Sequence, residues 1–151
     1  MRLVVQRVSG ASVRADGVEA GRIGRGAVVL VGVGSNDSAE VVDRMAAKLI
    51  GLRYFEDERG RTNLSLTDVN GALLVVSQFT LLADVRHGRR PGFTDAAAPE
   101  VAEPLVKRFV AGLRDAGAEV ATGRFGAAME VELVNDGPFT LVIDSAEDLG
   151  S

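Results

Sequence analysis

The sequence predicts an α+β fold, in which mainly antiparallel β-sheets form a barrel-like system packed against two principal helices. The first observation is a series of short apolar runs at the start of the chain, joined by turns too short to hold a helix. Such turns favour antiparallel pairing over parallel βαβ units. The second observation is a pair of longer stretches, residues 38–52 and 99–116, whose apolar residues recur at helical spacing.

Length and composition limit the organisation of the chain. With 151 residues a single domain is expected, and we predict that it covers residues 1–145 and that residues 146–151 form a polar tail. The absence of cysteine and the single histidine predict no disulfide and no zinc site, and we expect no metal or cofactor. The net charge of −4 argues against a broad nucleic-acid-binding face, but not against a protein that grips only the end of an RNA. No apolar run is long enough for a signal peptide or a membrane span, which predicts a cytoplasmic protein.

Strand-like runs occupy most of the first 33 residues. A two-residue hairpin signature, Asp16-Gly17, separates two of them and predicts a tight turn. Arg7 interrupts an otherwise apolar run, so it is either buried among several acceptors or exposed at a sheet edge. The runs predicted as strands are residues 3–8, 11–15, 18–23 and 27–33.

The two predicted helices have recognisable starts. Asp37 and Glu40 resemble a capping box at the beginning of the first helix. Pro99 suits the first turn of the second helix. Pro104 removes one internal hydrogen bond, which predicts either a distorted first turn or a helix that starts near Pro104.

The stretch at residues 72–82 is the centre of the predicted fold. Its unbroken apolar run, residues 73–76, is typical of a strand buried on both faces. Three hydrogen-bonding side chains then follow within four positions: Ser77, Gln78 and Thr80. A buried strand that ends in polar groups either bonds them to neighbouring backbone or uses them on a ligand.

A long loop, residues 83–98, follows the central strand. Loops of this length in compact domains are usually functional or disordered. Three arginines, Arg86, Arg89 and Arg90, lie within five positions of it. They are candidates for phosphate contacts, and a solvated loop is an equally good interpretation.

A second polar segment, residues 135–140, lies between strand-like runs at residues 129–134 and 141–144. It contains Gly137-Pro138, and because glycine tolerates unusual φ while proline restricts φ, we predict a turn. A Gly-Pro bond is also among the few that adopt the cis form. By residue type alone, Phe125 and Met129 are core candidates.

These segments together carry a resemblance to a known family. The chain resembles the D-aminoacyl-tRNA deacylases, the D-tyrosyl-tRNA(Tyr) deacylase family, along nearly its whole length. It departs from the family pattern at Gly92, where serine is expected, and at Phe139, where valine is expected. The motifs that carry the resemblance are Gln6-Arg7-Val8, Ala11-Ser12-Val13, Ser77-Gln78-Phe79-Thr80-Leu81, Arg90-Pro91-Gly92-Phe93, Thr122-Gly123-Arg124-Phe125 and Asn135-Asp136-Gly137-Pro138-Phe139-Thr140.

The resemblance implies an activity: a single deacylase domain that hydrolyses the ester between a D-amino acid and the terminal adenosine of tRNA. We further expect glycyl-tRNA to be cleaved and L-aminoacyl-tRNA to be rejected. In the family the hydroxyl at the 2′ position of the tRNA does much of the chemistry, while the protein supplies positioning and an oxyanion site. This accounts for a chain with no evident Ser-His-Asp set.

The resemblance also implies roles for residues. Members are homodimers in which a cis Gly-Pro pair, here Gly137-Pro138 with Arg7 in support, enters the partner's active site and reads chirality by exclusion. The catalytic candidates are Ser77, Gln78, Phe79 and Thr80. Phe125 and Met129 are expected to line the adenosine pocket.

Two alternatives of other classes stay open. A protein-only esterase would use Thr80 as nucleophile, but this requires a base within reach, and His87 lies in the arginine-rich loop. A non-catalytic module would use the same pocket to bind RNA ends or small amines. Turnover of aminoacyl-tRNA by catalytic amounts of protein distinguishes hydrolysis from capture.

Overall fold

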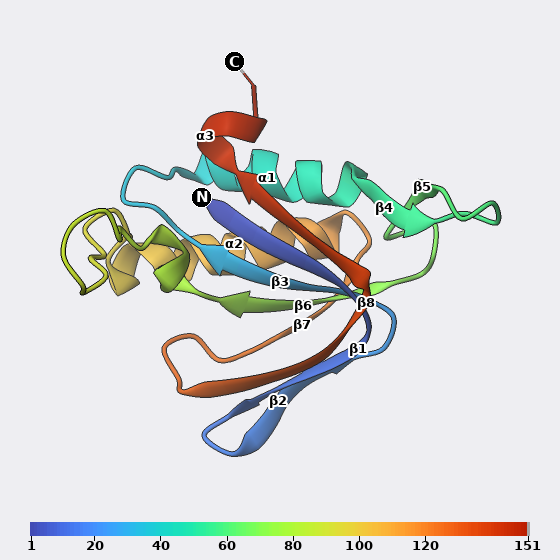
Figure 1. Ribbon diagram of the computed structural model, residues 1–151, viewed down its shortest axis with the longest axis horizontal. Helices are drawn as coiled ribbons and strands as arrows, with labels where there is room; N and C mark the ends of the chain where they lie inside the picture. Colours follow the sequence, from blue (N-terminus) through green and yellow to red (C-terminus); the bar gives the residue numbers. More distant parts are fainter. Residues whose placement is uncertain (151) are drawn as a thin grey trace.

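The computed structural model describes residues 1–150 and has the predicted α+β architecture, with a curved, barrel-like sheet and helices on one side (Figure 1). The strand order is β2-β1-β3-β6-β7, with β8 also paired to β1. The strands are β1 (Arg2–Ala15), β2 (Val18–Ile23), β3 (Gly26–Gly32), β6 (Ala72–Ser77), β7 (Glu119–Thr122) and β8 (Met129–Asp144).

The sheet nearly closes on itself because its two ends approach each other at a glycine. A Cβ atom at Gly21 on β2 would lie only 2.8 Å from the carbonyl oxygen of Thr122 on β7. A side chain at this position would push these strands apart. The absence of a side chain therefore lets the first and last strands in the order come together.

The strands pair in two different ways. β1 pairs antiparallel with β2, β3 and β8, as the short N-terminal turns predict. β6 instead lies parallel to both β3 and β7. Parallel neighbours need long connections, and here each connection contains one of the two long helices.

Helices α1 (Ala39–Gly51) and α2 (Pro99–Asp115) cover one face of the sheet side by side (Figure 1). The N-cap of α1 is Ser38, whose hydroxyl accepts a hydrogen bond from the Val41 amide at 3.3 Å, so the predicted capping by Asp37 is wrong. The Asp37 carboxylate instead accepts a bond from the Gly34 amide at 2.6 Å. α2 begins at Pro99 and includes Pro104 without a break.

Apolar side chains fill two layers, one between the sheet and the helices and one inside the curled sheet. β6 is buried along its apolar run and contributes to both layers, which confirms the prediction of a strand covered on two faces. The layer under the helices includes Met45, Leu49, Phe55, Leu73, Phe109 and Leu113, and the inner layer includes Val8, Val13, Ile23, Val28 and Leu74.

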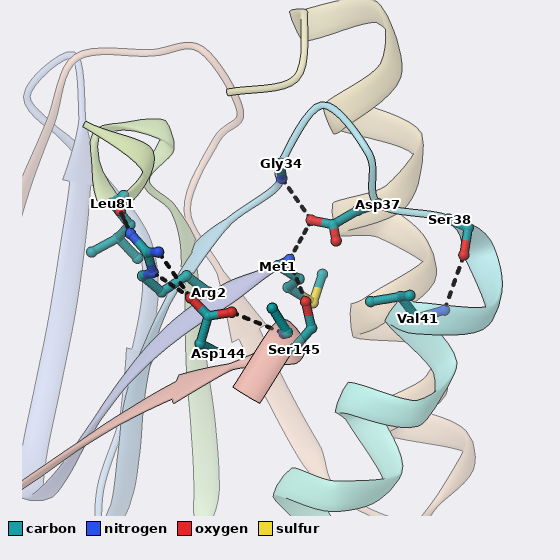
Figure 2. A network of polar contacts seen from close by, with 10 residues as sticks. Met1, Arg2, Gly34, Asp37, Ser38, Val41, Leu81, Asp144 and Ser145 are labelled. Atoms are coloured by element: carbon teal, nitrogen blue, oxygen red, sulfur yellow. Dashed lines mark hydrogen bonds and ion pairs between the residues drawn. The ribbon is translucent and has the colours of Figure 1, made fainter. Parts of the chain in front are cut away.

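The start of β1 ties several elements together (Figure 2). The α-ammonium group of Met1 forms an ion pair with Asp37 and donates a hydrogen bond to Ser145 Oγ at 2.8 Å. The Arg2 side chain bonds Asp144 Oδ2 at 2.9 Å and the Leu81 carbonyl oxygen at 2.6 Å. The first two residues therefore connect the turn before α1, the end of β8 and the 3₁₀ helix η1 (Phe79–Leu82).

The remaining elements lie at the edges. β4 (Arg53–Glu56) and β5 (Thr62–Ser65) form a separate two-stranded sheet. A short helix, α3 (Ser145–Asp148), includes the first residues of the predicted polar tail; the Asp144 side chain caps it by accepting a bond from the Ala146 amide at 2.9 Å. Ser151, the last residue of the predicted tail, lies outside the described residues. None of the helices formed by residues 1–150 has the length and apolar character that crossing a membrane requires.

Candidate active site

The polar end of β6 turns directly into η1. The Gln78 amide donates to the Val31 carbonyl oxygen at 2.7 Å, and the chain then bends so that the Gln78 side-chain amide donates to Thr80 Oγ1. The bend needs a glycine beneath it, since a Cβ atom at Gly32 would lie 2.5 Å from Leu82 Cδ2 and 3.0 Å from the Gln78 carbonyl oxygen. The absence of a side chain at Gly32 therefore lets η1 pack closely against β3.

A cleft of about 640 Å³ opens beside this strand end. Ser77 and Gln78 are half-buried in its wall, and Phe79 lies at its exposed side. Phe125 and Met129, far away in the sequence, line the same cleft. The structure therefore brings two predicted groups of site residues together. Thr80 does not line the cleft and contacts it through Gln78.

The loop after η1 also lines the cleft. The rings of Phe79 and Phe93 meet edge to face, with centroids 5.1 Å apart. Residues 96–98, all alanine, also line the cleft. The loop is held by the Ala97 amide, which donates to the Val33 carbonyl oxygen at 2.9 Å. Small side chains here leave the cleft open.

The departure from the family pattern at Gly92 leaves the backbone of this loop paired. The amides of Asp84 and Gly92 each donate to the other residue's carbonyl oxygen, at 2.7 and 2.8 Å. A Cβ atom at Gly92 would meet only the Asp84 carbonyl oxygen, at 3.8 Å, which is an ordinary contact. Serine would therefore fit this position, and glycine is not needed for the pairing.

The three arginines of the loop differ in their surroundings. The Arg86 guanidinium makes two hydrogen bonds to the Asp84 carboxylate, at 2.9 and 2.8 Å, and these bonds lower the pKa of Asp84 to about 2. Arg89 and Arg90 are exposed and form no ion pair with any residue of the described range 1–150. Arg86 is thus already neutralised, whereas the other two charges are free.

The segment around Gly137-Pro138 is a bulge within one long strand, not a turn between two strands. In the β1–β8 register Gln6 faces Thr140 and Val8 faces Asn135, so residues 136–139 lie opposite the single residue Arg7. The Gly137-Pro138 peptide bond is cis, and Gly137 has a φ of +136°. The prediction of two separate strands with a turn is therefore wrong, because β1 pairs with β8 on both sides of the bulge.

The Arg7 side chain holds the bulge through hydrogen bonds to backbone carbonyl groups. The side chain is buried and donates to the carbonyl oxygens of Asp136 at 3.1 Å and Tyr54 at 2.8 Å. Its guanidinium carbon lies 4.7 Å from the centre of the Phe139 ring. Of the two interpretations of Arg7, the buried one with several acceptors is confirmed.

Two further residues hold the bulge and were not singled out from the sequence. The Asn135 side-chain amide donates to the carbonyl oxygens of Arg7 at 2.8 Å and Phe139 at 3.0 Å, which closes the base of the bulge. Tyr54 supplies an acceptor for Arg7 and stacks on Phe139, with ring centroids 6.4 Å apart. The departure at Phe139 thus adds an aromatic ring between Arg7 and Tyr54. The sequence signal for Asn135 was its position before Asp-Gly-Pro, whereas nothing local marked Tyr54.

The bend in β8 and the turn of β6 into η1, whose first residue Phe79 lines the cleft, lie at opposite ends of the sheet (Figure 1). Through the strand register, Ser77 is level with Val31 and Leu3, near the start of β1. The other end of β6, at Ala72, is level with Gly26 and Val8, beside the bulge. Gly137 accordingly lines a different cavity, together with Arg7, Arg25, Glu56 and Asp136.

Comparison with known proteins identifies the family. Residues 4–144 match the family model described as D-Tyr-tRNA(Tyr) deacylase. The chain belongs to the D-Tyr-tRNA(Tyr) deacylase family. It is 59% identical to the D-aminoacyl-tRNA deacylase of Chloroflexus aurantiacus over 147 residues, covering 97% of this chain and 92% of the relative. It is 58% identical to the D-aminoacyl-tRNA deacylase of Symbiobacterium thermophilum, covering 96% of both chains.

Solved structures share the deacylase fold. The c-Myc DNA Unwinding Element Binding Protein superposes with a TM-score of 0.90 at 39% identity, covering 95% of this chain and 98% of that one. A probable eukaryotic D-amino acid tRNA deacylase superposes with a TM-score of 0.81 at 21% identity, covering 94% and 97%. The second likeness bears on the fold alone.

Proposed function

We propose that this chain hydrolyses the ester bond of D-aminoacyl-tRNA and releases free tRNA and the D-amino acid. Family membership over residues 4–144 supports the substrate class. The observation that carries the proposal is the cleft, in which half-buried hydrogen-bonding groups lie beside an aromatic ring and a thioether. This combination suits an adenosine that carries a reactive ester, because the base needs an apolar surface and the carbonyl needs donors.

In this proposal the terminal adenosine binds beside Phe125 and Met129, with its ester near the end of β6. Ser77, Gln78 and the backbone of Phe79 supply donors to the carbonyl oxygen as it gains negative charge. Thr80 orients Gln78 through the hydrogen bond between their side chains. The tRNA 2′-hydroxyl assists the attack of water, so the protein contributes mainly position and electrostatics.

Selection against L-aminoacyl groups requires a second subunit. The cis Gly137-Pro138 bulge projects at the end of the sheet away from the cleft of its own chain, so we propose that it enters the cleft of a partner in a homodimer. Its carbonyl groups would hold the substrate's amino group, and an L side chain would point into them. Arg7, Asn135 and Phe139 keep the bulge rigid enough for this exclusion.

Selection by exclusion of L side chains also predicts how glycyl-tRNA behaves. A pocket that only rejects a misplaced side chain cannot reject a substrate that has none. We therefore propose that glycyl-tRNA is cleaved as well. The free charges of Arg89 and Arg90, with a smaller contribution from Arg86, would contact tRNA phosphates, and a cytoplasmic location follows from such a substrate.

The experiment compares deacylation of D-tyrosyl-, glycyl- and L-tyrosyl-tRNA at one catalytic enzyme concentration. The first two should be hydrolysed with turnover and the third should survive. Capture of D-tyrosyl-tRNA without release of tyrosine would indicate the binding module instead. Survival of glycyl-tRNA would contradict selection by exclusion.

Thr80 provides the test of the chemical scheme. If the tRNA hydroxyl assists the attack, Thr80→Ala should keep substantial single-turnover activity, because only the orientation of Gln78 is weakened. An acyl group trapped on Thr80, together with complete loss of activity in the variant, would support the protein-only esterase.

A further inference from the structure

A second cavity adjoins the cleft and has no role in the proposal above. Its volume is about 390 Å³, and it lies between α2 and residues 122–125, which are the end of β7 and the segment that follows it. Ser77 and Phe125 line both cavities, so the two spaces are neighbours on one surface. A polymer whose end lies in the cleft can therefore continue into the second cavity.

The charge of this cavity contrasts with the rest of the molecule. Three cationic side chains and a single carboxylate, Glu103, line it, whereas the whole chain has a net charge of −4. An excess of positive charge on an acidic protein is a local feature that favours an anionic ligand. The cationic residues are Lys107, Arg114 and Arg124.

The positive groups are available to a ligand. Lys107 faces Glu103 at 3.5 Å and Arg124 faces Asp16 at 3.7 Å, and in both pairs the partners are largely exposed. Exposed ion pairs are weak and readily exchanged. Arg114 donates one hydrogen bond, to the Val120 carbonyl oxygen at 2.9 Å, and a guanidinium group has five donors.

The remainder of the lining suits a nucleoside. Val75, Val106 and Val110 provide apolar surface, and Ser77 and Thr122 add hydroxyl groups. Phe125, which is half-buried, lines both cavities. Aromatic rings beside positive charges are the usual means of binding single-stranded nucleic acid.

We propose that this second cavity binds the nucleotide that precedes the terminal adenosine of the substrate, with phosphate contacts from Lys107 and Arg124. The inference rests on the proposed function, because it assumes that adenosine occupies the neighbouring cleft. Gly123 lies where the two subsites meet: a Cβ atom there would lie 2.6 Å from Met129 Sδ, so the wall of the second cavity packs directly against a side chain that lines the cleft.

Two small esters separate the subsites. D-tyrosyl-adenosine fills only the cleft, whereas the same ester on the dinucleotide cytidylyl-adenosine would also fill the second cavity. The wild type should have a higher kcat/KM for the dinucleotide. In Lys107→Gln/Arg124→Gln this advantage should disappear, the change should lie in KM, and kcat/KM for the adenosine ester should equal that of the wild type. The slope of log(kcat/KM) against log[salt] on the dinucleotide should fall by about 0.7, because the variant no longer neutralises its phosphate.

A matched control removes two positive charges elsewhere. Arg59 and Arg61 are exposed on the tip between β4 and β5, outside both cavities, and Arg59→Gln/Arg61→Gln should leave both esters unaffected. Ala111→Leu fills the cavity from an exposed position of α2 without changing charge and should selectively weaken use of the dinucleotide.

The outcomes distinguish this inference from the proposed function. Equal losses on both esters in the charge variant, or no loss on either, would overturn the second subsite. If the wild type hydrolyses neither ester nor D-tyrosyl-tRNA, the proposed function fails. Binding of uncharged cytidylyl-adenosine, compared with adenosine in the wild type and the charge variant, then still decides whether the cavity takes the additional nucleotide.

Discussion

At the scale of single residues, one buried cation determines the shape of the bulge in β8. Arg7 is 5% exposed and faces two backbone carbonyl oxygens and an aromatic ring. A guanidinium group can reach all three because its donors are spread over a rigid plane. An ammonium group on a flexible stem cannot.

Arg7→Lys should therefore leave one of the two carbonyl groups unsatisfied. We expect a loss of about 1–3 kcal/mol in the free energy of unfolding and a larger proportional loss of deacylase activity. Chemical denaturation and kcat/KM on D-tyrosyl-tRNA measure the two effects. Arg14→Lys is the matched control on the same strand, since Arg14 is exposed and, among residues 1–150, its guanidinium pairs only with Glu130. Equal behaviour of both variants would contradict the supporting role.

Tyr54 is the other residue with an unusual environment. Its hydroxyl is buried and has no hydrogen-bond partner among the described residues. Tyr54→Phe should raise the free energy of unfolding by about 1 kcal/mol at neutral pH, because it removes an unsatisfied polar group. Destabilisation of that size would instead indicate that the hydroxyl has a partner.

The same residue predicts a pH dependence. Burial raises the pKa of Tyr54 above its ordinary value of 10.0, so the phenol ionises more readily in the unfolded chain. Stability should be unaffected below pH 10.0 and should fall as the pH rises above it, and Tyr54→Phe should reduce that fall. Because the chain has one tyrosine and no tryptophan, absorbance near the phenolate band follows this group alone.

At the scale of elements, the structure shows which arginines of the arginine-rich loop are paired, so their contribution to tRNA binding can be tested separately. Arg89→Gln/Arg90→Gln should weaken tRNA binding and lower its salt slope by about 0.7–0.9 for each phosphate that is no longer neutralised. Arg86→Gln should change the slope less, because Asp84 already neutralises Arg86. Filter binding over a series of salt concentrations measures both. An unchanged slope in the double variant would mean that the loop is only solvated.

Local patterns predicted most elements and missed those that depend on a distant partner. The helices, the hairpin at Asp16-Gly17 and the buried β6 each have a periodicity or turn signature of their own. The continuity of β8 does not, because Asn135 to Thr140 has the composition of a turn and only pairing with β1 makes it a bulge. Ser38 displaced Asp37 as the helix cap for a similar reason, since Asp37 is engaged by Met1.

The residues of the candidate site also divide into those that local sequence patterns marked and those that they did not. Ser77 and Gln78 stood out as polar groups at the end of a buried strand, but that pattern left open whether they bond neighbouring backbone or a ligand. That Phe125 and Met129 lie in the same cleft could be expected only from the family resemblance. Tyr54 contributes a backbone carbonyl, which every residue has, and therefore left no trace in the residue pattern.

At the scale of the whole molecule, the parallel pairings of β6 decide where the functional parts lie. They put the polar end of β6 at one end of the sheet, while the antiparallel β1–β8 pairing puts the bulge at the other. A chain built in this way cannot bring its own Gly137 to its own Gln78. In the proposed homodimer, each complete site would therefore combine the cleft of one copy with the bulge of the other.

Two inactive variants should complement each other if the site is shared. Gln78→Ala impairs the cleft, and Gly137→Ala strains the bulge, since its Cβ would lie 3.0 Å from the Arg7 guanidinium at a φ of +136°. A mixed dimer has one intact site, so an equal mixture refolded together should regain roughly a quarter of wild-type activity. Sedimentation should show dimers throughout. No recovery in confirmed mixed dimers would mean that each site is built from one chain.

The positive charge on the α-amino group of Met1 takes part in the contacts that hold the fold together. A formyl or acetyl group, or a peptide tag joined before Met1, would turn this cation into a neutral amide and deprive Asp37 of its partner. Asp37 holds the turn at Gly34, which pairs with Ala96 in the cleft wall, so the disturbance would extend to the cleft. An affinity tag at the amino end should therefore lower both thermal stability and activity, whereas the same tag after α3 should not. The end of the chain at which an expression vector adds its tag should therefore affect the stability and activity of this enzyme.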